Sequence, residues 1–446
     1  MIESLILTVQ TVIIASTGSL RDALFAYAFF YPLVMAWMWI IGGLWYYHRW
    51  ENKHDLGPEF PPPVREYPAA SILIPCFNEE DNLHQTIHYA LATEYPDFEV
   101  IAINDGSSDR TGALLDALAA QHPRLRVIHL ATNQGKAMAL RAGAIAARHE
   151  FLVCIDGDAL LHPKAVAWIM SHFATGQRVG AVTGNPRIIN RSTLLGKLQV
   201  GEFSSIIGLM KRAQRVYGRL FTVSGVIAGY RRTALHRIGY WSEHMITEDI
   251  DISWRLQMDH WDIRYEPDAL CYIYMPETFK GLWRQRLRWA QGGVEVLLKH
   301  GRNLLIWRRR RFWAVALEYL ASVTWAYVML LIIVLYFIGL VMPLPPAWQV
   351  NTLLPQWNGV ILGLTALAQF GVSMYIDRRY EPKKRFLRNY FWIIWYPLAF
   401  WLLIWLTTIV AVPKTLLKRH QRRARWTSPD RGVRAPLDDA NEAGKL

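Results

Sequence analysis

Two aspartates separated by one glycine, Asp156 and Asp158, directly follow the apolar run 151–155. Residues two apart on an extended chain project to the same side, so both carboxylates can face one ligand. Carboxylate oxygens suit Mg²⁺ or Mn²⁺, and two of them leave coordination positions for water and a diphosphate. The spacing therefore predicts a divalent metal site, although Asp-Gly is also a common pair in polar turns.

Two further loops carry polar groups suited to a nucleotide. Asp105 opens Asp-Gly-Ser-Ser-Asp, where its carboxylate can accept hydrogen bonds from a uracil ring or a ribose. The serines and the second aspartate would equally cap a helix. The run Asn133 to Lys136 begins a helical stretch and places backbone N–H groups and an ammonium where a phosphate can rest. A solvated surface lysine fits that pattern equally well.

Asp249 lies in Thr247-Glu248-Asp249, at the start of a helix expected over 250–260. One interpretation makes Asp249 a general base that takes the proton from an attacking sugar hydroxyl. The other is that acidic residues in a first turn complement the helix dipole. From this motif alone, the second interpretation is favoured.

Gln285, Arg288 and Trp289 lie in a helical stretch from 279 to about 300, where apolar residues are interleaved with arginines. An amphipathic helix on a membrane surface explains that composition. Alternatively, the planar guanidinium of Arg288 binds a diphosphate and Trp289 packs against a sugar ring. Both interpretations can hold, because one face of a helix can contact lipid while one end covers an active site.

The segment that must position these groups alternates short β-branched runs with helical runs. We expect strands at 71–75, 99–104, 125–130 and 151–155, with helices at 79–93, 110–121 and 136–148. This alternation predicts βαβ units, a parallel sheet covered on both faces and hence an α/β fold. Ligands of such sheets bind at the carboxyl ends of the strands, where Glu79, Asp105 and Asp156 fall.

Four stretches contain no Asp, Glu, Lys or Arg, and they are 4–20, 23–47, 319–376 and 389–413. A helix needs about 20 apolar residues to cross a bilayer. We expect two spans within 1–48 and about three within 312–413, where Pro343 to Pro346 breaks a hairpin. Between these regions we expect a catalytic domain over 49–277 and amphipathic interface helices over 278–311, with a basic tail over 414–446 at the end of the chain.

The basic residues that give the chain a formal net charge of +13 cluster beside the apolar stretches. Lys and Arg at the ends of spans mark the cytoplasmic side, so we expect the large domain to face the cytoplasm. The same clustering favours a membrane partner over nucleic acid. A single crossing by 389–413 would place the tail outside, whereas Pro397 would also permit a re-entrant hairpin. The side of the tail therefore stays open.

Five motifs follow one another along the chain and are flanked by spans: Asn78-Glu79, Asp105, Asp156-Gly157-Asp158, Thr247-Glu248-Asp249 and Gln285-x-x-Arg288-Trp289. Their co-occurrence in this order resembles the processive family-two glycosyltransferases, which include cellulose, chitin, hyaluronan and poly-N-acetylglucosamine synthases. The longer runs look closest to the bacterial poly-β-1,6-N-acetyl-D-glucosamine synthases of biofilm matrix. Those runs are 74–80, 181–187, 249–254 and 281–293.

The resemblance implies a GT-A (Rossmann-like) catalytic fold, a UDP-sugar donor, Mg²⁺ or Mn²⁺ as cofactor, and inversion at the anomeric carbon. It makes Asp249 the base, supported by Glu248. It assigns the uridine end to Glu79 and Asp105, the diphosphate to Lys136 and Arg288, the metal and donor to Asp156 and Asp158, and the acceptor or gating side to Ser224, Gly225, Gln285 and Trp289.

The expected activity is processive transfer of N-acetylglucosamine from UDP-N-acetylglucosamine into a β-1,6-linked exopolysaccharide, with export across the bacterial inner membrane. The alternatives are a hyaluronan, chitin or cellulose type of synthase and a non-processive transferase acting on a lipid carrier. A transporter is disfavoured because the spans lack charged residues. The resemblance also implies a small membrane subunit and regulation by cyclic di-GMP. The polymer path or an aromatic belt would account for Trp392, Trp395, Tyr396, Trp401 and Trp405.

Overall fold

The computed structural model describes residues 2–52, 57–353, 356–380, 390–393 and 396–417. Its centre is one eight-stranded sheet with the strand order β3-β2-β1-β4-β7-β6-β8-β5. The first four strands run parallel to one another and lie where we expected them. They are β1 (Ala70–Cys76), β2 (Phe98–Asn104), β3 (Leu125–His129) and β4 (Phe151–Ile155).

The second half of the sheet is mixed, so the prediction of a wholly parallel sheet is wrong. Strand β7 runs antiparallel to both β4 and β6, and β5 runs antiparallel to β8, while β6 and β8 pair in parallel. The alternation of strands and helices that predicted parallel pairing ends at residue 155, and it does not govern the later strands. These strands are β5 (Leu160–Leu161), β6 (Val179–Ile188), β7 (Ile227–Arg231) and β8 (Asp262–Ile273).

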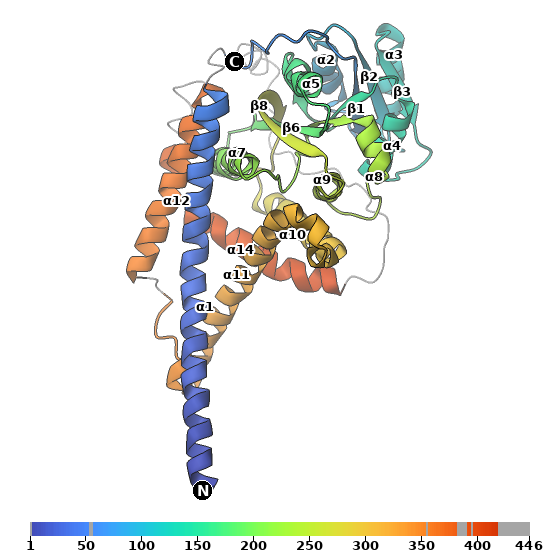
Figure 1. The fold of residues 1–446 in the computed structure, drawn as a ribbon. Helices are drawn as coiled ribbons and strands as arrows, with labels where there is room; N and C mark the ends of the chain where they lie inside the picture. The colour runs from blue at the N-terminus through green and yellow to red at the C-terminus, as the bar shows by residue number, and fades with distance from the viewer. Residues whose placement is uncertain (1, 53–56, 354–355, 381–389, 394–395, 418–446) are drawn as a thin grey trace.

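Helices cover both faces of the sheet (Figure 1). Successive residues of β1 contribute to opposite faces: Ile72 and Ile74 belong to one buried cluster and Leu73 to the other. The first cluster includes residues of α2 (Leu83–Leu91), α3 (Thr111–Gln121) and α5 (Ala165–Thr175). The second includes residues of α4 (Lys136–Ala146), α8 (Arg232–Ile238) and α9 (Glu248–Met258). This two-sided burial confirms the predicted α/β architecture.

A second group of helices lies between the sheet and the long apolar helices. Helix α10 (Phe279–His300) lies where the amphipathic helix was expected, and α14 (Tyr396–Leu416) packs beside it. The sequence did not lead us to expect the continuous run of α6 (Leu194–Glu202), the π-helix η2 (Phe203–Leu209) and α7 (Met210–Val216). The π-helical form is rare and is frequent at functional sites.

The long apolar helices α1 (Ile2–Tyr46), α11 (Arg310–Val341) and α12 (Gln356–Asp377) extend away from the sheet (Figure 1). Three described segments are long and apolar enough to cross a bilayer: Leu20–Glu51, Phe312–Val341 and Trp357–Tyr380. Helix α11 ends before the proline-rich stretch that was expected to break a hairpin. Short helical turns join these elements: η1 (Tyr47–Glu51), η3 (Gly301–Leu305), η4 (Trp307–Arg309), η5 (Pro346–Trp348) and η6 (Arg378–Tyr380).

Two details of the expected membrane regions differ from the structure. One continuous helix, α1, stands where two N-terminal spans were expected, because a charged pair ends an apolar run without ending a helix. Arg21 and Asp22 pair with each other at 2.8 Å and the helix continues through them. Helix α14 lies where the third C-terminal span was expected, but it runs transverse to α1 (Figure 1). The residues of the basic tail from 418 onward lie outside the described part of the chain.

Candidate active site

The carboxyl ends of β1 and β2 are fastened to each other by their loops. Asn78 adopts a positive φ of 53°, and its Oδ1 accepts a hydrogen bond from Ser108 N at 2.9 Å. The N–H of Glu79 donates to Thr111 Oγ1 at 2.8 Å. The Glu79 side chain is buried and accepts from Asn82 Nδ2 at 3.2 Å. These hydrogen bonds therefore hold the two loops together beside the predicted uridine end of the site.

Asp105 is fully buried at the end of β2, beneath the loop that leads into α4. Its two oxygens accept backbone hydrogen bonds from Gln134 N and Gly135 N, each at 2.8 Å. Burial raises the pKa of this carboxyl, and the two N–H donors oppose that rise. These N–H groups, which we expected to cradle a phosphate, thus bind Asp105 instead. Gly135 has a φ of +88°, which a glycine adopts without strain.

Lys136 begins α4 and joins the motifs of three different segments. Its Nζ lies 2.5 Å from Asp156 Oδ1 and 3.2 Å from Glu248 Oε1, and it donates to the Gly225 carbonyl at 3.0 Å. Burial alone would lower the pKa of Lys136, but the two carboxylates raise it overall. The ammonium therefore stays charged at the centre of an acidic site.

The Asp156 and Asp158 carboxylates lie beyond the end of β4, as the spacing predicted. Asp156 Oδ1 is buried and, apart from its ion pair with Lys136, accepts no hydrogen bond of good geometry from the described residues. Burial and the charge of Asp158 raise the pKa of Asp156, while Lys136 opposes them. Such an oxygen fits a hard divalent cation. The described residues contain no group of three His, Cys, Asp or Glu that could hold a metal ion alone.

Asp249 occupies the first turn of α9, where its Oδ1 accepts from the N–H of Ile250 at 2.9 Å. Burial, then the negative charge of Glu248, raise its pKa to about 6, whereas Lys136 and Arg288 lower it. A carboxylate tuned in this way is mostly ionised at neutral pH and is a better proton acceptor than an ordinary aspartate. The geometry therefore allows both interpretations of the motif, because one residue begins the helix and faces the site.

The loop Phe221–Gly225 passes directly beside Asp249. A Cβ placed on Gly225 would lie 3.2 Å from Asp249 Oδ2 and 3.3 Å from Lys136 Nζ, so a larger residue here would crowd both charged groups. The loop is held by Ser224 N, which donates to Thr183 Oγ1 at 2.8 Å, and by Val223 N, which donates to Ser253 Oγ at 2.8 Å. The structure thus brings Ser224 and Gly225 to the site.

Helix α10 carries three of the predicted site residues, Gln285, Arg288 and Trp289, which differ in their exposure. Arg288 is exposed, and its charge lowers the pKa of Asp249. Trp289 is half-buried, and Gln285 Oε1 accepts from Arg286 Nη1 at 2.8 Å. Arg286, which was not predicted from the sequence, is buried, pairs with Glu202 at 2.8 Å and lies 4.2 Å from the centre of the Trp289 ring. An arginine within an amphipathic run gives no sequence signal of a partner 84 residues away.

The segment that carries Asp249 also packs closely against the backbone of α10. A Cβ placed on Gly292 would lie 2.1 Å from Thr247 Oγ1, immediately before the Glu248-Asp249 pair. Farther along α9, the buried carboxylate of Asp251 accepts from Lys299 at 2.7 Å and pairs with His300 at 2.9 Å. Contacts at Thr247 and Asp251 therefore hold the start of α9 against α10.

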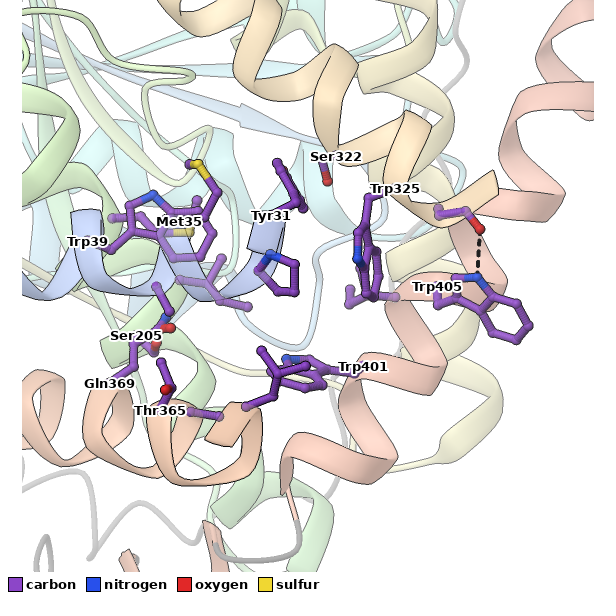
Figure 2. Close-up of a pocket in the computed structure, with 18 of the residues that line it drawn as sticks. Tyr31, Met35, Trp39, Ser205, Ser322, Trp325, Thr365, Gln369, Trp401 and Trp405 are labelled. Carbon is purple, nitrogen blue, oxygen red and sulfur yellow. Dashed lines mark hydrogen bonds between the residues drawn. The ribbon is translucent and has the colours of Figure 1, made fainter. Parts of the chain in front are cut away.

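A cavity of about 280 Å³ lies on the membrane side of this site, between α1, α11, α12, α14 and η2 (Figure 2). Its wall is rich in aromatic rings, with a few hydroxyl and amide groups. Trp405 Nε1 donates to the Ala326 carbonyl at 2.8 Å, so its ring is held in place. Gln369 Nε2 donates to Ser205 Oγ at 2.8 Å, which joins α12 to η2. The aromatic residues of the wall are Tyr31, Trp39, Trp325, Phe370, Trp401 and Trp405.

Of the aromatic residues expected along a polymer path, Trp401 and Trp405 line this cavity. Trp392 instead lies beneath Lys197, whose Nζ is 5.5 Å from the ring centre. Trp395 falls outside the described residues, as does the side chain of Tyr396. Residues of α1 and α11 also line the cavity, although they were not expected from the sequence to lie along the polymer path.

Comparison with known proteins gives both a family and a fold. A family model described as glycosyltransferase like family 2 matches residues 68–292. Poly-β-1,6-N-acetyl-D-glucosamine synthases of Staphylococcus epidermidis strain RP62A and Staphylococcus aureus strain MSSA476 are each 36% identical to this chain over 408 residues, 92% of this chain and 98% of each relative.

Among solved structures, a mannosyltransferase of Pyrobaculum calidifontis in complex with GDP-Man and Mn²⁺ is similar to this chain with a TM-score of 0.57. The two are 18% identical, and the likeness covers 91% of this chain and all of the other. That likeness shows the fold, which is the expected GT-A fold. With a family match over half of the sequence and relatives similar along nearly all of it, the chain belongs to glycosyltransferase family 2.

Proposed function

We propose that this chain is a processive, inverting glycosyltransferase that polymerises N-acetylglucosamine from UDP-N-acetylglucosamine into a β-1,6-linked exopolysaccharide. The observation that carries the proposal is the near full-length similarity to relatives named as synthases of that polymer. The geometry supports it, because Lys136 pairs with both Asp156 and Glu248. Asp249, which follows Glu248, has a raised pKa. These are the groups that transfer from a nucleotide-sugar requires.

The donor would lie across the ends of β1, β2 and β4. Glu79 and Asp105 form the uridine end; Asp105 also fixes the loop that carries Lys136. Lys136 and Arg288 would neutralise the diphosphate from opposite sides, one from α4 and one from α10. A positive charge aimed at the leaving group stabilises the transition state most, because negative charge develops there.

Asp156 and Asp158 would hold Mg²⁺ or Mn²⁺ together with the diphosphate. When bound, the ion supplies Lewis-acid stabilisation of the leaving UDP. The ion pair between Lys136 and Asp156 shows that this carboxylate already lies beside a positive charge. Lys136 would then turn from the carboxylate toward the phosphate oxygens when the donor arrives.

The acceptor hydroxyl would lie beside Asp249, over Gly225. Its oxygen forms the new bond to the anomeric carbon as the bond from that carbon to UDP breaks, and its proton passes to Asp249 Oδ2. A single displacement inverts the anomeric centre and needs one base, with no covalent nucleophile. Glu248 keeps the pKa of Asp249 high, and Gln285 and Trp289 would line the acceptor side.

The aromatic cavity would receive the product, since sugar rings pack on aromatic faces and the membrane helices enclose it (Figure 2). A chain built from a cytosolic donor has to cross the inner membrane, so the catalytic domain would face the cytoplasm. We also propose, from the family resemblance, a small membrane subunit as partner and cyclic di-GMP as regulator. The basic segment 418–425 is the candidate contact for cyclic di-GMP.

The test is to incubate membranes containing the chain with UDP-N-acetylglucosamine, UDP-glucose or UDP-glucuronic acid and to measure the initial rate of UDP release. UDP-N-acetylglucosamine should be strongly preferred, because a site that hydrogen-bonds an N-acetyl group is left with unpaired polar groups by other sugars. The product should be degraded by a hydrolase specific for β-1,6-linked N-acetylglucosamine. A preference for UDP-glucose, or a requirement for two different donors, would replace this proposal with a cellulose or hyaluronan type of synthase.

A further inference from the structure

One buried lysine near the site has no part in the mechanism above. Lys211, on α7, is 6% exposed, and its Nζ donates one hydrogen bond, to Thr183 Oγ1 at 3.1 Å. Its other close neighbour is the Tyr265 ring, whose centre is 5.9 Å from Nζ. No carboxylate of the described residues lies within ion-pairing distance. An ammonium has three donors, so two of them have no acceptor among the described residues.

Such a group is expensive to bury. Burial lowers the pKa of Lys211 to about 7, although the negative charge of Asp249 opposes the effect. Lys136 shows the contrast, because it is buried among two carboxylates and a carbonyl that satisfy its charge. An apolar side chain at position 211 would avoid the desolvation of Lys211. The retained ammonium therefore calls for an acceptor that arrives with a ligand.

The position of Lys211 indicates which ligand that is. Thr183 Oγ1 accepts both from Lys211 and from Ser224 N, and Ser224 precedes the glycine that lies against Asp249. The residue before Lys211 along α7, Met210, lines the aromatic cavity. Lys211 is thus next to a residue of the cavity wall along α7, and it shares the hydroxyl of Thr183 with the loop that passes beside Asp249.

We propose that Lys211 is an acceptor-binding residue whose ammonium, anchored on Thr183, donates hydrogen bonds to the terminal sugar of the growing chain and holds its nucleophilic hydroxyl toward Asp249. This inference rests on the proposed function. In a β-1,6 linkage the nucleophile is a primary alcohol on a freely rotating C5–C6 bond. A base alone does not fix such a group, so a second contact to the same sugar is needed to align it.

The test compares Lys211→Met and Lys211→Arg with the parent in the full-length chain in lipid nanodiscs. Lys211→Met should lower polymer synthesis by at least about tenfold, the equivalent of one hydrogen bond to a charged donor. It should raise KM for short β-1,6-linked N-acetylglucosamine oligomers added as acceptors, while the Kd for UDP stays within about twofold. The fraction of donor hydrolysed by water should rise, and Lys211→Arg should restore part of the transfer.

A matched pair tests the anchor: Thr183→Val removes the hydroxyl that Lys211 contacts, whereas Thr183→Ser keeps it. The first should repeat the change in the ratio of transfer to hydrolysis and the second should not. Because Lys211→Met removes a desolvated charge, its melting temperature should not fall.

Parental polymer yield and acceptor KM in Lys211→Met would overturn the proposal. So would an equal fall of melting temperature, UDP binding and transfer in Lys211→Met and Lys211→Arg, since that pattern marks a structural role. If the parent released no UDP from UDP-N-acetylglucosamine, the proposed function itself would fail, and that result does not depend on any variant.

Discussion

The pH dependence of transfer should report the ionisation of Asp249. Burial and Glu248 raise the pKa of this carboxyl to about 6. A base must be deprotonated to act, so the rate should fall as the pH drops through that value. With a pKa of about 6, about nine-tenths of the sites are ionised at pH 7 and about one-tenth at pH 5, which predicts a roughly tenfold loss of rate.

The assay is the initial rate of UDP release at saturating donor and metal, with enzyme stability checked at each pH. Glu248→Gln removes the charge that raises the pKa of Asp249, so the acid limb of the profile should move to lower pH. At pH 7, Asp249→Asn should reduce polymer formation by about 10² to 10⁴-fold while UDP still binds. An acid limb that stays in place in Glu248→Gln, or polymer formation by Asp249→Asn at the parental rate, would refute the assignment of the base.

Three other substitutions probe separate parts of the chain. Asp158→Ala should weaken UDP binding in the presence of Mg²⁺ or Mn²⁺ but not in EDTA; equal metal dependence in variant and parent contradicts the metal assignment. Gly292→Ala should displace Thr247, whose Oγ1 would lie 2.1 Å from the new Cβ, and lower the turnover rate more than UDP affinity; full activity would show that α10 does not seat the base. Arg212 is completely buried and pairs with Glu51 and Asp377. Arg212→Met should therefore lower the melting temperature, because losing one member of a buried ionic group costs about 3–5 kcal/mol. The exposed pair of Arg110 serves as a control, and Arg110→Met should change stability little.

The sequence predicted the parallel half of the sheet, strands β1 to β4, because these strands follow a local alternation of strands and helices. The four parallel strands and the acidic groups at their ends lie where alternating strands and helices placed them, because each βαβ unit is specified by neighbouring residues. Asp105 and Asp156 needed no knowledge of distant contacts to be located, since both directly follow buried strands. The convergence of Lys136 with Glu248 depended on tertiary packing, yet the family resemblance had placed both at one site.

The remainder depended on contacts between distant segments, for which the sequence offers no local signal. Antiparallel β7 enters the sheet after the helical segment 194–216, and nothing in its own residues states its direction. From the sequence, Arg286 is indistinguishable from the other cations of an amphipathic helix. Its burial and its ion pair with Glu202 become visible only in the folded structure. Lys211 resembles a surface lysine in a basic helix, although it is buried. At the N-terminus, Arg21 and Asp22 indicated the end of an apolar run correctly but not the end of a helix.

Helix α7 carries three consecutive residues that face three parts of the molecule. Met210 lines the aromatic cavity, and Lys211 donates to Thr183, whose hydroxyl also holds the loop 221–225 through Ser224 N. Arg212 is completely buried and pairs with Glu51 at 2.7 Å and with Asp377 at 2.9 Å, which lie at the ends of the membrane segments. Successive helical residues point about 100° apart, so a single turn suffices for all three contacts.

A buried ionic group of this kind is often no more stabilising than apolar residues of similar volume. We therefore infer that it fixes how the catalytic domain is seated on α1 and α12, so that the base and the cavity stay aligned. Arg187 is also buried and pairs with Asp377 at 2.6 Å. Joint replacement of all four residues of the group, Arg212, Glu51, Asp377 and Arg187, by apolar residues should then restore the melting temperature lost in Arg212→Met without restoring polymer length. If polymer length recovered together with stability, the group would serve stability alone, because seating by apolar packing would align the acceptor equally well.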